Sequence, residues 1–259
     1  MGIYNCATTL AHGISSILRQ SYTNWELILC DDCSTDGTLA LAEQYARDYP
    51  NIRLLRNDRN MRLSHSLNRC LSVARGTLIA RMDADDISLP DRFEKQVRFL
   101  TEHPDYVVVG GGVIPFDEDG EKALRLPPEH PGVRDLVWDT PFYHPTIMMR
   151  KSAYDDLGGY LVSSRTRKGQ DIDLWFRLFA ANFRGYNLQE PLLMYRESVS
   201  DYRSKRDLRS ALGVCRTKWH GFRLNRFPLH LYPFVLKPLV AALVPKRIMH
   251  RLHNPKPRP

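Results

Sequence analysis

The chain has 259 residues, of which 43% are hydrophobic and 25% are charged, and its formal net charge is +8. These values are typical of a globular protein that buries a core without disulfides, so they exclude a small disulfide-stapled scaffold. The charge is uneven, because residues 1–202 carry 23 Lys and Arg against 28 Asp and Glu, whereas residues 203–259 carry 14 against one. The body is therefore mildly acidic, and the basic balance belongs to the C-terminal fifth.

Strands and helices alternate along the first hundred residues. The opening MGIYNCA contains only a short apolar stretch, which predicts a truncated first strand. In chain order the further predicted elements are a helix over 9–20, a strand over 25–30, a helix over 38–49, a strand over 51–57, a helix over 64–75, a strand over 77–82 and a helix over 90–103. This alternation predicts an α/β fold with a mostly parallel central sheet flanked by helices.

The second half predicts a strand over 105–116, a strand within 142–160, a helix over 169–183 and a strand over 190–196. The glycine run at 110–112 has no GxGxxG spacing and no following helix, so it indicates close backbone packing rather than a phosphate loop. Cys30 and Cys33 form a lone CxxC without a second pair or a nearby histidine. This favours burial and a turn over a metal or redox site.

Acidic residues follow two of the predicted strands. Asp31 and Asp32 end the strand over 25–30, and Asp83, Asp85 and Asp86 follow the strand over 77–82. In doubly wound sheets ligands bind at the carboxyl ends of the strands, so both clusters are candidates for a binding site. The alternative is that each aspartate caps the turn or helix that follows it, and for Asp86 both interpretations stay open.

The segment Asp83-Ala84-Asp85 places two carboxylates on one side of a turn. Hard divalent cations bind oxygen ligands, so these residues predict Mn²⁺ or Mg²⁺ shared with a nucleoside diphosphate. The cation would offset the repulsion between the aspartates and would stabilise the diphosphate as a leaving group. At the neighbouring strand end, Asp31 can accept hydrogen bonds from a base or a ribose.

Asp171 stands in the first turn of the helix predicted over 169–183. The dipole at a helix N-terminus favours the charged form of a carboxyl group there. An ionised Asp171 can take a proton from an attacking hydroxyl, which is the work of a general base. The alternative is a structural role in which its charge only complements the helix N-terminus.

Four stretches in a fixed order resemble a known enzyme family. They are CDDCSTDGT (30–38), ARGTLIARMDADD (74–86), FYHPTIMMRKS (142–152) and GQDIDLWFRL (169–178). Together they resemble the inverting family 2 glycosyltransferases of the GT-A nucleotide-diphospho-sugar transferase fold, most of all those of bacterial polysaccharide and O-antigen biosynthesis. The resemblance extends over roughly residues 2–200. It implies transfer of a sugar from a nucleotide-diphosphate sugar to an acceptor hydroxyl, with inversion at the anomeric carbon.

The resemblance also implies roles for individual residues. The positions that match the nucleoside-binding residues of the family are Tyr4, Asn5, Asp31 and Asp32. Asp83 matches an aspartate that serves ribose and metal, and Asp85 matches the metal ligand. Asp171 matches the catalytic base, whereas His144 and Trp175 match the acceptor side. The implied cofactors are Mn²⁺ or Mg²⁺ and a nucleotide-sugar donor, by default a UDP-sugar.

The chain departs from the family pattern in three ways. Cys33 stands where the family usually has Gly, and Gln170 stands where it often has Glu. The first strand is short, which bears on how completely the nucleotide pocket forms. No Gln-x-x-Arg-Trp stretch follows Asp171. Because processive synthases of the family hold their polymer with that motif, its absence favours transfer of a single sugar.

Residues 1–202 are predicted to form the glycosyltransferase domain, and residues 203–259 a basic helical extension. Four prolines interrupt the apolar segment 227–253, so it is too broken to span a bilayer. We expect it to lie on a membrane surface, with Lys246, Arg247 and Arg251 toward anionic headgroups. The alternative is that it packs on the domain. The membrane position suits a lipid-diphosphate-linked saccharide as acceptor, and predicts a cytoplasmic enzyme that is peripheral on the inner face of the plasma membrane.

Two other functions are weaker. A sugar-phosphate nucleotidyltransferase needs an early glycine-rich loop with basic residues, and GIYNCATTLAHG (2–13) has none. A non-enzymatic protein that binds nucleic acid or membrane would rest on the basic tail alone. There the basic residues alternate with Pro and aliphatic residues rather than with stacking aromatics, so nucleic acid is not expected as a partner.

Overall fold

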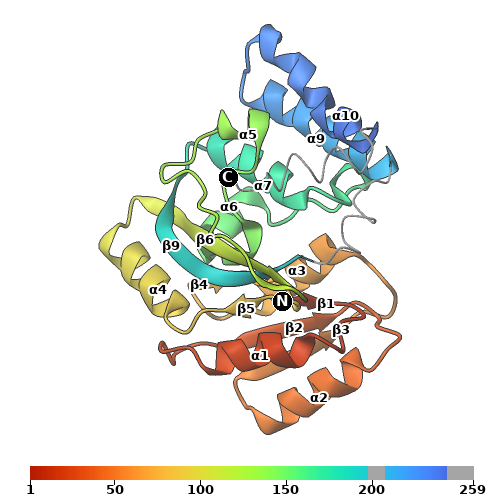
Figure 1. Cartoon of the computed structure of the whole chain (residues 1–259), viewed down its shortest axis with the longest axis vertical. Helices are drawn as coiled ribbons and strands as arrows, with labels where there is room; N and C mark the ends of the chain where they lie inside the picture. The colour runs from red at the N-terminus through yellow and green to blue at the C-terminus, as the bar shows by residue number, and fades with distance from the viewer. Residues whose placement is uncertain (198–207, 244–259) are drawn as a thin grey trace.

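The computed structural model describes residues 1–197 and 208–243 of the chain (Figure 1). The N-terminal part holds a parallel sheet in the order β1 (Gly2–Ile3), β2 (Leu27–Asp31) and β3 (Ile52–Arg56). The helices that connect these strands and lead out of them are α1 (Leu10–Leu18), α2 (Thr38–Asp48) and α3 (Leu63–Val73). The predicted alternation of strands and helices is confirmed here, and β1 pairs with β2 through two residues only.

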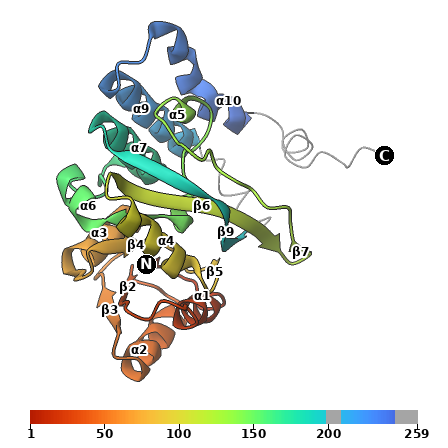
Figure 2. The same cartoon turned by 90° about the vertical axis from the view of Figure 1, so that its left-hand side faces the viewer.

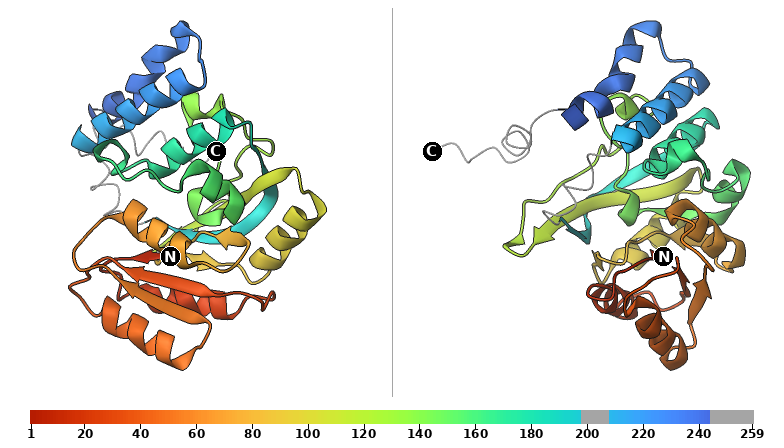
Figure 3. Two further views of the ribbon diagram at one scale, coloured as in Figure 1. Left: turned by 180° about the vertical axis from the view of Figure 1, so that it is seen from behind. Right: turned by 90° about the vertical axis from the view of Figure 1, so that its right-hand side faces the viewer.

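The side chains of β2 alternate between the two faces of this sheet. Leu27 and Leu29 pack in one cluster with residues of α1 and α2, whereas Ile28 and Cys30 pack with Cys70 of α3. Alternation with a period of two is what a strand covered on both faces requires. Figure 3 shows the resulting layers, with α3 on the opposite side of the strands from α2.

A second sheet follows in the chain. Its strand order is β4 (Leu78–Ala80), β8 (Met148–Arg150), β6 (Tyr106–Asp117), β9 (Arg184–Arg196) and β5 (Ile87–Ser88), and β7 (Gly120–Glu121) pairs with the end of β6. Only β6 and β9 are parallel, while the other four pairings are antiparallel. The prediction of one mostly parallel central sheet is therefore wrong for this half of the molecule.

One of the four antiparallel pairings has a local cause. Parallel neighbours need a long crossover, whereas a short turn returns the chain antiparallel. β7 folds back on β6 as a hairpin, with Phe116 opposite Glu121. The other three pairings join segments far apart in the chain, such as Ile87 of β5 with Met194 of β9.

The glycine run of β6 lies against β9. A Cβ atom on Gly110 would lie 2.4 Å from the Asn187 Oδ1, and one on Gly111 would lie 2.5 Å from Leu192 Cδ1. The ladder between the two strands changes register on both sides of Gly112. These positions thus allow two strands to approach closely, and the interpretation of the run as backbone packing rather than a phosphate loop is confirmed.

Helices cover the second sheet and extend beyond it. They are α4 (Arg92–Glu102), α5 (Asp135–Trp138), α6 (Lys151–Leu157), α7 (Gln170–Ala180), α9 (Leu208–Leu224) and α10 (Lys237–Leu243), with the 3-10 helix η3 (Leu229–Leu236) before α10. The buried side chains Trp175, Phe176 and Phe222 join α7 and α9 in the largest core cluster. Figures 1 and 2 show α9 and α10 at the end of the molecule opposite α2.

The described part of the predicted extension packs on the body. Phe227 and Val235 are buried in the same core cluster, whereas Leu229 is 82% exposed and Leu243 is 72% exposed. The predicted boundary after residue 202 and the residues Lys246, Arg247 and Arg251 lie outside the described residues. Within residues 1–197 and 208–243, no helix is both long and apolar enough to cross a bilayer.

Candidate active site

Three aspartates that follow β4 come together. One carboxylate oxygen each of Asp83, Asp85 and Asp86 lies within 4.8 Å of the others. The sequence predicted the convergence of Asp83 and Asp85, and the structure adds Asp86. Because the three side chains carry like charges, the site needs a compensating cation or a bound proton.

The interpretation of Asp86 as a helix cap is wrong. Asp86 is 1% exposed, and its Oδ1 accepts a hydrogen bond from the backbone N–H of Arg196 on β9 at 3.0 Å. Burial, together with the charges of Asp83 and Asp85, raises the pKa of Asp86 to about 8. Its Oδ2 is buried without a hydrogen-bond partner among the described residues.

Arg81 supplies positive charge to this cluster. It follows β4 and is 6% exposed, and its two terminal nitrogens donate to the two oxygens of Asp83 at 2.6 Å each. Its backbone is held by a hydrogen bond from its N–H to the carbonyl of Ile147 and by one from Arg92 to its own carbonyl. A buried arginine in a two-point contact with a carboxylate holds that carboxylate in a fixed plane.

These residues fit a hard divalent cation. The three carboxylates offer converging oxygen atoms, and the unpartnered Oδ2 of Asp86 is a buried acceptor that a cation would satisfy. Mn²⁺ and Mg²⁺ favour such oxygen ligands and take further oxygens from phosphate and water. The cluster could therefore hold the cation that the sequence predicts, with Asp86 as an additional ligand.

The residues predicted to bind a nucleoside gather at the carboxyl ends of β1 and β2. Asp31 is fully buried; its Oδ2 accepts from the backbone N–H of Ser34, and its Oδ1 has no partner among the described residues. Asn5 accepts from the backbone N–H of Thr35 through its Oδ1. Tyr4 is 48% exposed. This corner thus presents one unsatisfied acceptor and one exposed ring.

Asp32 has a different environment from Asp31. Its carboxylate accepts three short hydrogen bonds, from the side chain of Asn57 at 2.6 Å and from the backbone N–H groups of Met61 and Arg62 at 2.7 and 2.8 Å. Arg62 has a positive φ of 75°, so the loop before α3 adopts a conformation that needs such support. Asp32 therefore shapes the loop beside Asp31.

Asp171 lies at the start of α7, as predicted, but its electrostatics differ from the prediction. Burial raises its pKa, while the N–H of Ile172 and the charge of Arg81 act in the opposite direction. The backbone N–H groups of the helix N-terminus favour the charged form of Asp171, as expected, but burial has the larger effect and the pKa rises overall. The charges of Arg81 and Asp83 also act on the pKa of Asp171, Arg81 lowering it and Asp83 raising it.

His144 and Trp175 are more buried than their predicted place on the acceptor side implies. His144 is 6% exposed and its Nε2 lies 2.8 Å from the hydroxyl of Tyr160, while burial holds its pKa well below the ordinary value. Trp175 is fully buried and its ring contacts Phe142 and His144. The structure gives Trp175 a packing contact behind the site, because α7 turns it toward the core rather than toward solvent.

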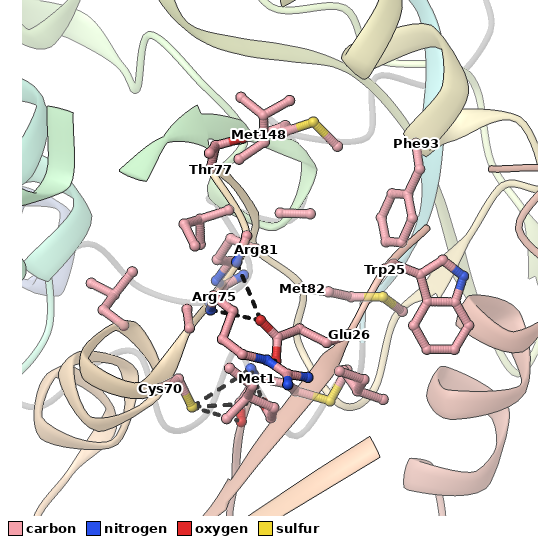
Figure 4. Close-up of a pocket in the computed structure, with 18 of the residues that line it drawn as sticks. Met1, Trp25, Glu26, Cys70, Arg75, Thr77, Arg81, Met82, Phe93 and Met148 are labelled. Atoms are coloured by element: carbon pink, nitrogen blue, oxygen red, sulfur yellow. Dashed lines mark hydrogen bonds and ion pairs between the residues drawn. The ribbon is translucent and has the colours of Figure 1, made fainter. Parts of the chain in front are cut away.

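A cavity also opens away from the acid cluster. It has a volume of about 550 Å³ and opens between β2 and β4, which belong to different sheets. Figure 4 shows Met1, Glu26 and Cys70 on one side of it and Arg81 at its wall, with Glu26 bonded to Arg75. None of the predicted site residues lines this cavity, so the acid cluster itself is the stronger guide to chemistry.

Comparison with known proteins shows the family of this chain. A model of glycosyl transferase family 2 matches residues 1–158. The chain belongs to glycosyl transferase family 2. The Bacillus subtilis protein EpsE is 51% identical over 255 residues, which cover 98% of this chain and 91% of that protein. The chain is thus a glycosyltransferase. Membership of this family supports glycosyl transfer rather than nucleotidyl transfer, the other enzymatic function considered from the sequence.

Two further relatives are named for their reactions or pathways. The O-antigen biosynthesis glycosyltransferase WbnJ of Escherichia coli is 33% identical and covers 71% of this chain and 72% of its own length. The UDP-Gal:alpha-D-GlcNAc-diphosphoundecaprenol beta-1,3-galactosyltransferase of Escherichia coli is 26% identical over 219 residues, 83% of this chain and 78% of that protein. The chain is related to glycosyltransferases of bacterial surface-polysaccharide biosynthesis, as its motifs indicated.

Two solved structures confirm the GT-A fold. Staphylococcus aureus TarS 1–349 in complex with UDP has a TM-score of 0.67 at 18% identity, covering 98% of this chain and 76% of that one. The mannosyltransferase PcManGT of Pyrobaculum calidifontis, in complex with GDP-Man and Mn²⁺, also has a TM-score of 0.67 at 18% identity, covering 98% and 77%. The fold class predicted from the motifs is confirmed, apart from the sheet directions corrected above.

Proposed function

We propose that the protein transfers a single sugar from a nucleotide-diphosphate sugar to an acceptor hydroxyl, with inversion at the anomeric carbon. The observation that carries this proposal is the convergence of Asp83, Asp85 and Asp86 after β4, beside the buried Arg81. The aspartate cluster suits a diphosphate with its cation, and Asp171 suits the acceptor hydroxyl.

The donor nucleoside is proposed to bind at the corner formed by Tyr4, Asn5, Asp31 and Asp32. An N–H or O–H of the base or ribose would satisfy the free Oδ1 of Asp31, and leaving such a buried acceptor unpaired costs about 1–3 kcal/mol. Asp32 and Asn5 hold the loops on either side. The nucleotides bound by TarS and PcManGT support a nucleoside diphosphate, and a UDP-sugar is the first choice.

Asp83, Asp85 and Asp86 are proposed to hold Mn²⁺ or Mg²⁺ together with the donor diphosphate. When bound, the cation supplies Lewis-acid stabilisation of the charge that develops on the leaving diphosphate. The Mn²⁺ in the PcManGT complex supports this choice of metal. The protein itself contributes the fixed orientation of Asp83 through Arg81 and the burial of Asp86.

Asp171 is proposed as the general base. Its raised pKa makes its carboxylate a stronger proton acceptor than an exposed aspartate, and the charge of Arg81 acts against the rise. The acceptor oxygen attacks the anomeric carbon on the face opposite the diphosphate. Its proton passes to Asp171 as the bond to the diphosphate breaks, and a single displacement of this kind inverts the configuration.

We further propose a lipid-diphosphate-linked saccharide as acceptor, and a cytoplasmic enzyme peripheral on the inner face of the plasma membrane. The name of the diphosphoundecaprenol-dependent relative supports this acceptor class. Eight of the fourteen exposed large hydrophobic residues of the described chain lie within residues 208–243, a stretch with six Lys and Arg and no Asp or Glu. A surface that is both apolar and basic suits an anionic bilayer.

Vesicle flotation tests the membrane part of the proposal. The full chain should float with vesicles that contain anionic phospholipid, and Leu229→Ser combined with Leu243→Ser should weaken flotation because both side chains are largely exposed. Tyr49→Ser, on an exposed residue of the N-terminal part, is the matched control. Equal binding to neutral vesicles or retention on DNA at about 150 mM salt would contradict an anionic bilayer as the partner.

A panel of nucleotide sugars tests the proposed reaction. With Mn²⁺, the correct donor should raise the melting temperature, because a ligand that binds only the folded state stabilises it. Asp85→Ala should abolish this metal-dependent shift. Asp171→Asn should keep the shift and lower the transfer rate about 10²–10⁴-fold. Asp156→Asn, on the exposed side of α6, should change neither; normal transfer by Asp171→Asn would remove Asp171 as the base.

A further inference from the structure

We propose that Arg81 is a positioning residue of the transfer reaction: its buried guanidinium fixes the carboxylate of Asp83 by a two-point contact and so orients this ligand of the cation on the donor side. This inference rests on the function proposed above. It concerns a residue that the sequence motifs did not single out, although Arg81 interrupts an otherwise apolar stretch, TLIARM (77–82).

Arg81 contacts Asp83 from the buried side of the carboxylate. Arg81 has 6% of its side chain exposed and Asp83 has 33%, so the guanidinium lies on the buried side of the carboxylate. Both oxygens of Asp83 accept from Arg81 at 2.6 Å, which fixes the plane of the carboxylate as well as its position. Each oxygen keeps a second lone pair for a ligand, and the exposed side of Asp83 remains open for it.

The backbone of Arg81 is also fixed. Its N–H donates to the carbonyl of Ile147 at 2.9 Å, and its carbonyl accepts from the fully buried Arg92 at 2.7 Å. Arg92 also donates to the Ile147 carbonyl at 3.3 Å, so the segments after β4 and before β8 are joined through α4. A side chain supported in this way can hold its partner with little freedom, which is what residues behind metal ligands do in metal sites.

The hold on Asp83 needs the planar fork of the guanidinium. Arg81→Lys keeps the charge and loses the fork, because a lysine ammonium is a point charge without the bidentate geometry. Arg81→Met loses both. The pair of variants therefore separates the fork from the charge.

The experiment measures Mn²⁺ binding by the full chain with the metal alone, by electron paramagnetic resonance, and the Mn²⁺ concentration that gives half-maximal sugar transfer. We expect both variants to lose Mn²⁺ affinity about 10–100-fold, the usual loss when the partner of a metal ligand is removed. Transfer should need correspondingly more Mn²⁺, whereas kcat at saturating Mn²⁺ should change less. Arg150→Met is the matched control, because Arg150 is a partly buried arginine that donates to the carbonyls of Tyr106 and Leu100, away from the cluster.

Each result bears on the proposal. Wild-type Mn²⁺ affinity in Arg81→Lys overturns the positioning of Asp83, and this variant keeps the buried charge if Arg81→Met fails to fold. An unchanged Mn²⁺ requirement for transfer in the folded variants overturns the part of Arg81 in the reaction. If the wild-type chain transfers no sugar, the proposed function fails, whereas the Mn²⁺ measurement still tests the hold on Asp83.

Discussion

Gly221 on α9 lies against the ring of Phe176 on α7, and this contact connects the C-terminal helices to the helix that carries Asp171. A Cβ atom at Gly221 would lie 2.1, 2.2 and 2.5 Å from three atoms of the Phe176 ring. Ordinary contacts begin near 3.4 Å, so Gly221→Ala creates an overlap of about an ångström. Phe176 is 1% exposed and packs against Phe222, so its ring has no free space to enter.

The free energy of unfolding should fall in this variant despite a better helix former. Overpacking a core costs about 1–3 kcal/mol, and the overlap with three ring atoms places Gly221→Ala at the upper end. The helix preference of Ala over Gly returns about 1 kcal/mol. The net loss is about 1–2 kcal/mol. This lowers the melting temperature by about 2–8 °C, because each kcal/mol moves it by about 2–4 °C at this chain length.

The transfer rate should fall as well. If α7 shifts to relieve the overlap, Asp171 moves with it, and a misplacement of about an ångström can cost 10²-fold in rate. Differential scanning fluorimetry and a transfer assay on the same preparation measure both effects. Gly132→Ala is the control, because no atom lies within 4 Å of its added Cβ. A melting temperature at or above that of the wild type would refute the packing of α9 on α7 described here.

Three further predictions concern the loops and the base. Cys33 has a positive φ of 62°, a conformation that costs a residue with a side chain about 1–2 kcal/mol. Because Gly also adds entropy to the unfolded chain, Cys33→Gly should raise the free energy of unfolding in urea by at most about 1 kcal/mol. An unchanged midpoint of urea unfolding would contradict this strain. Asp32→Ala should lower the free energy of unfolding by at least about 2 kcal/mol, because it leaves the N–H groups of Asn57, Met61 and Arg62 without their acceptor. It should also weaken binding of the nucleotide sugar, which isothermal titration calorimetry would measure. The base must be ionised to accept a proton, and the pKa of Asp171 is raised. The transfer rate should therefore begin to fall on acidification before the pH reaches about 3.9, the ordinary pKa of an aspartate. A rate that stays constant down to about pH 4 would argue against this base.

The sequence predicts the first half of the fold well because its signals are local. The apolar run of β2 and the helical spacing of α2, α3 and α4 lie within short windows, and all four elements form where predicted. The second sheet depends on pairings between distant residues, such as Ile87 with Met194 and Val108 with Met149. No local pattern encodes which strand becomes a neighbour, so the directions in this sheet required the structure.

The residues of the site likewise differ in how far local sequence predicts their role. Position at a strand end or a helix start is a local property, and it located Asp31, Asp83, Asp85 and Asp171. Burial is a property of the whole fold, and it decided what the sequence missed. Burial outweighs the effect of the helix N-terminus on the pKa of Asp171, and Trp175 lies in the core rather than toward solvent.

The charge of the acid cluster accounts for its affinity for a divalent cation. With Asp83, Asp85 and Asp86 ionised, the cluster carries three negative charges. The guanidinium of Arg81 offsets part of this charge through its two bonds to Asp83, and the charge of the buried Arg92 also interacts with Asp86. Without a further cation, burial and like charges favour a proton on Asp86. A bound Mn²⁺ or Mg²⁺ would take the place of that proton, and the diphosphate of the donor would supply further oxygen ligands.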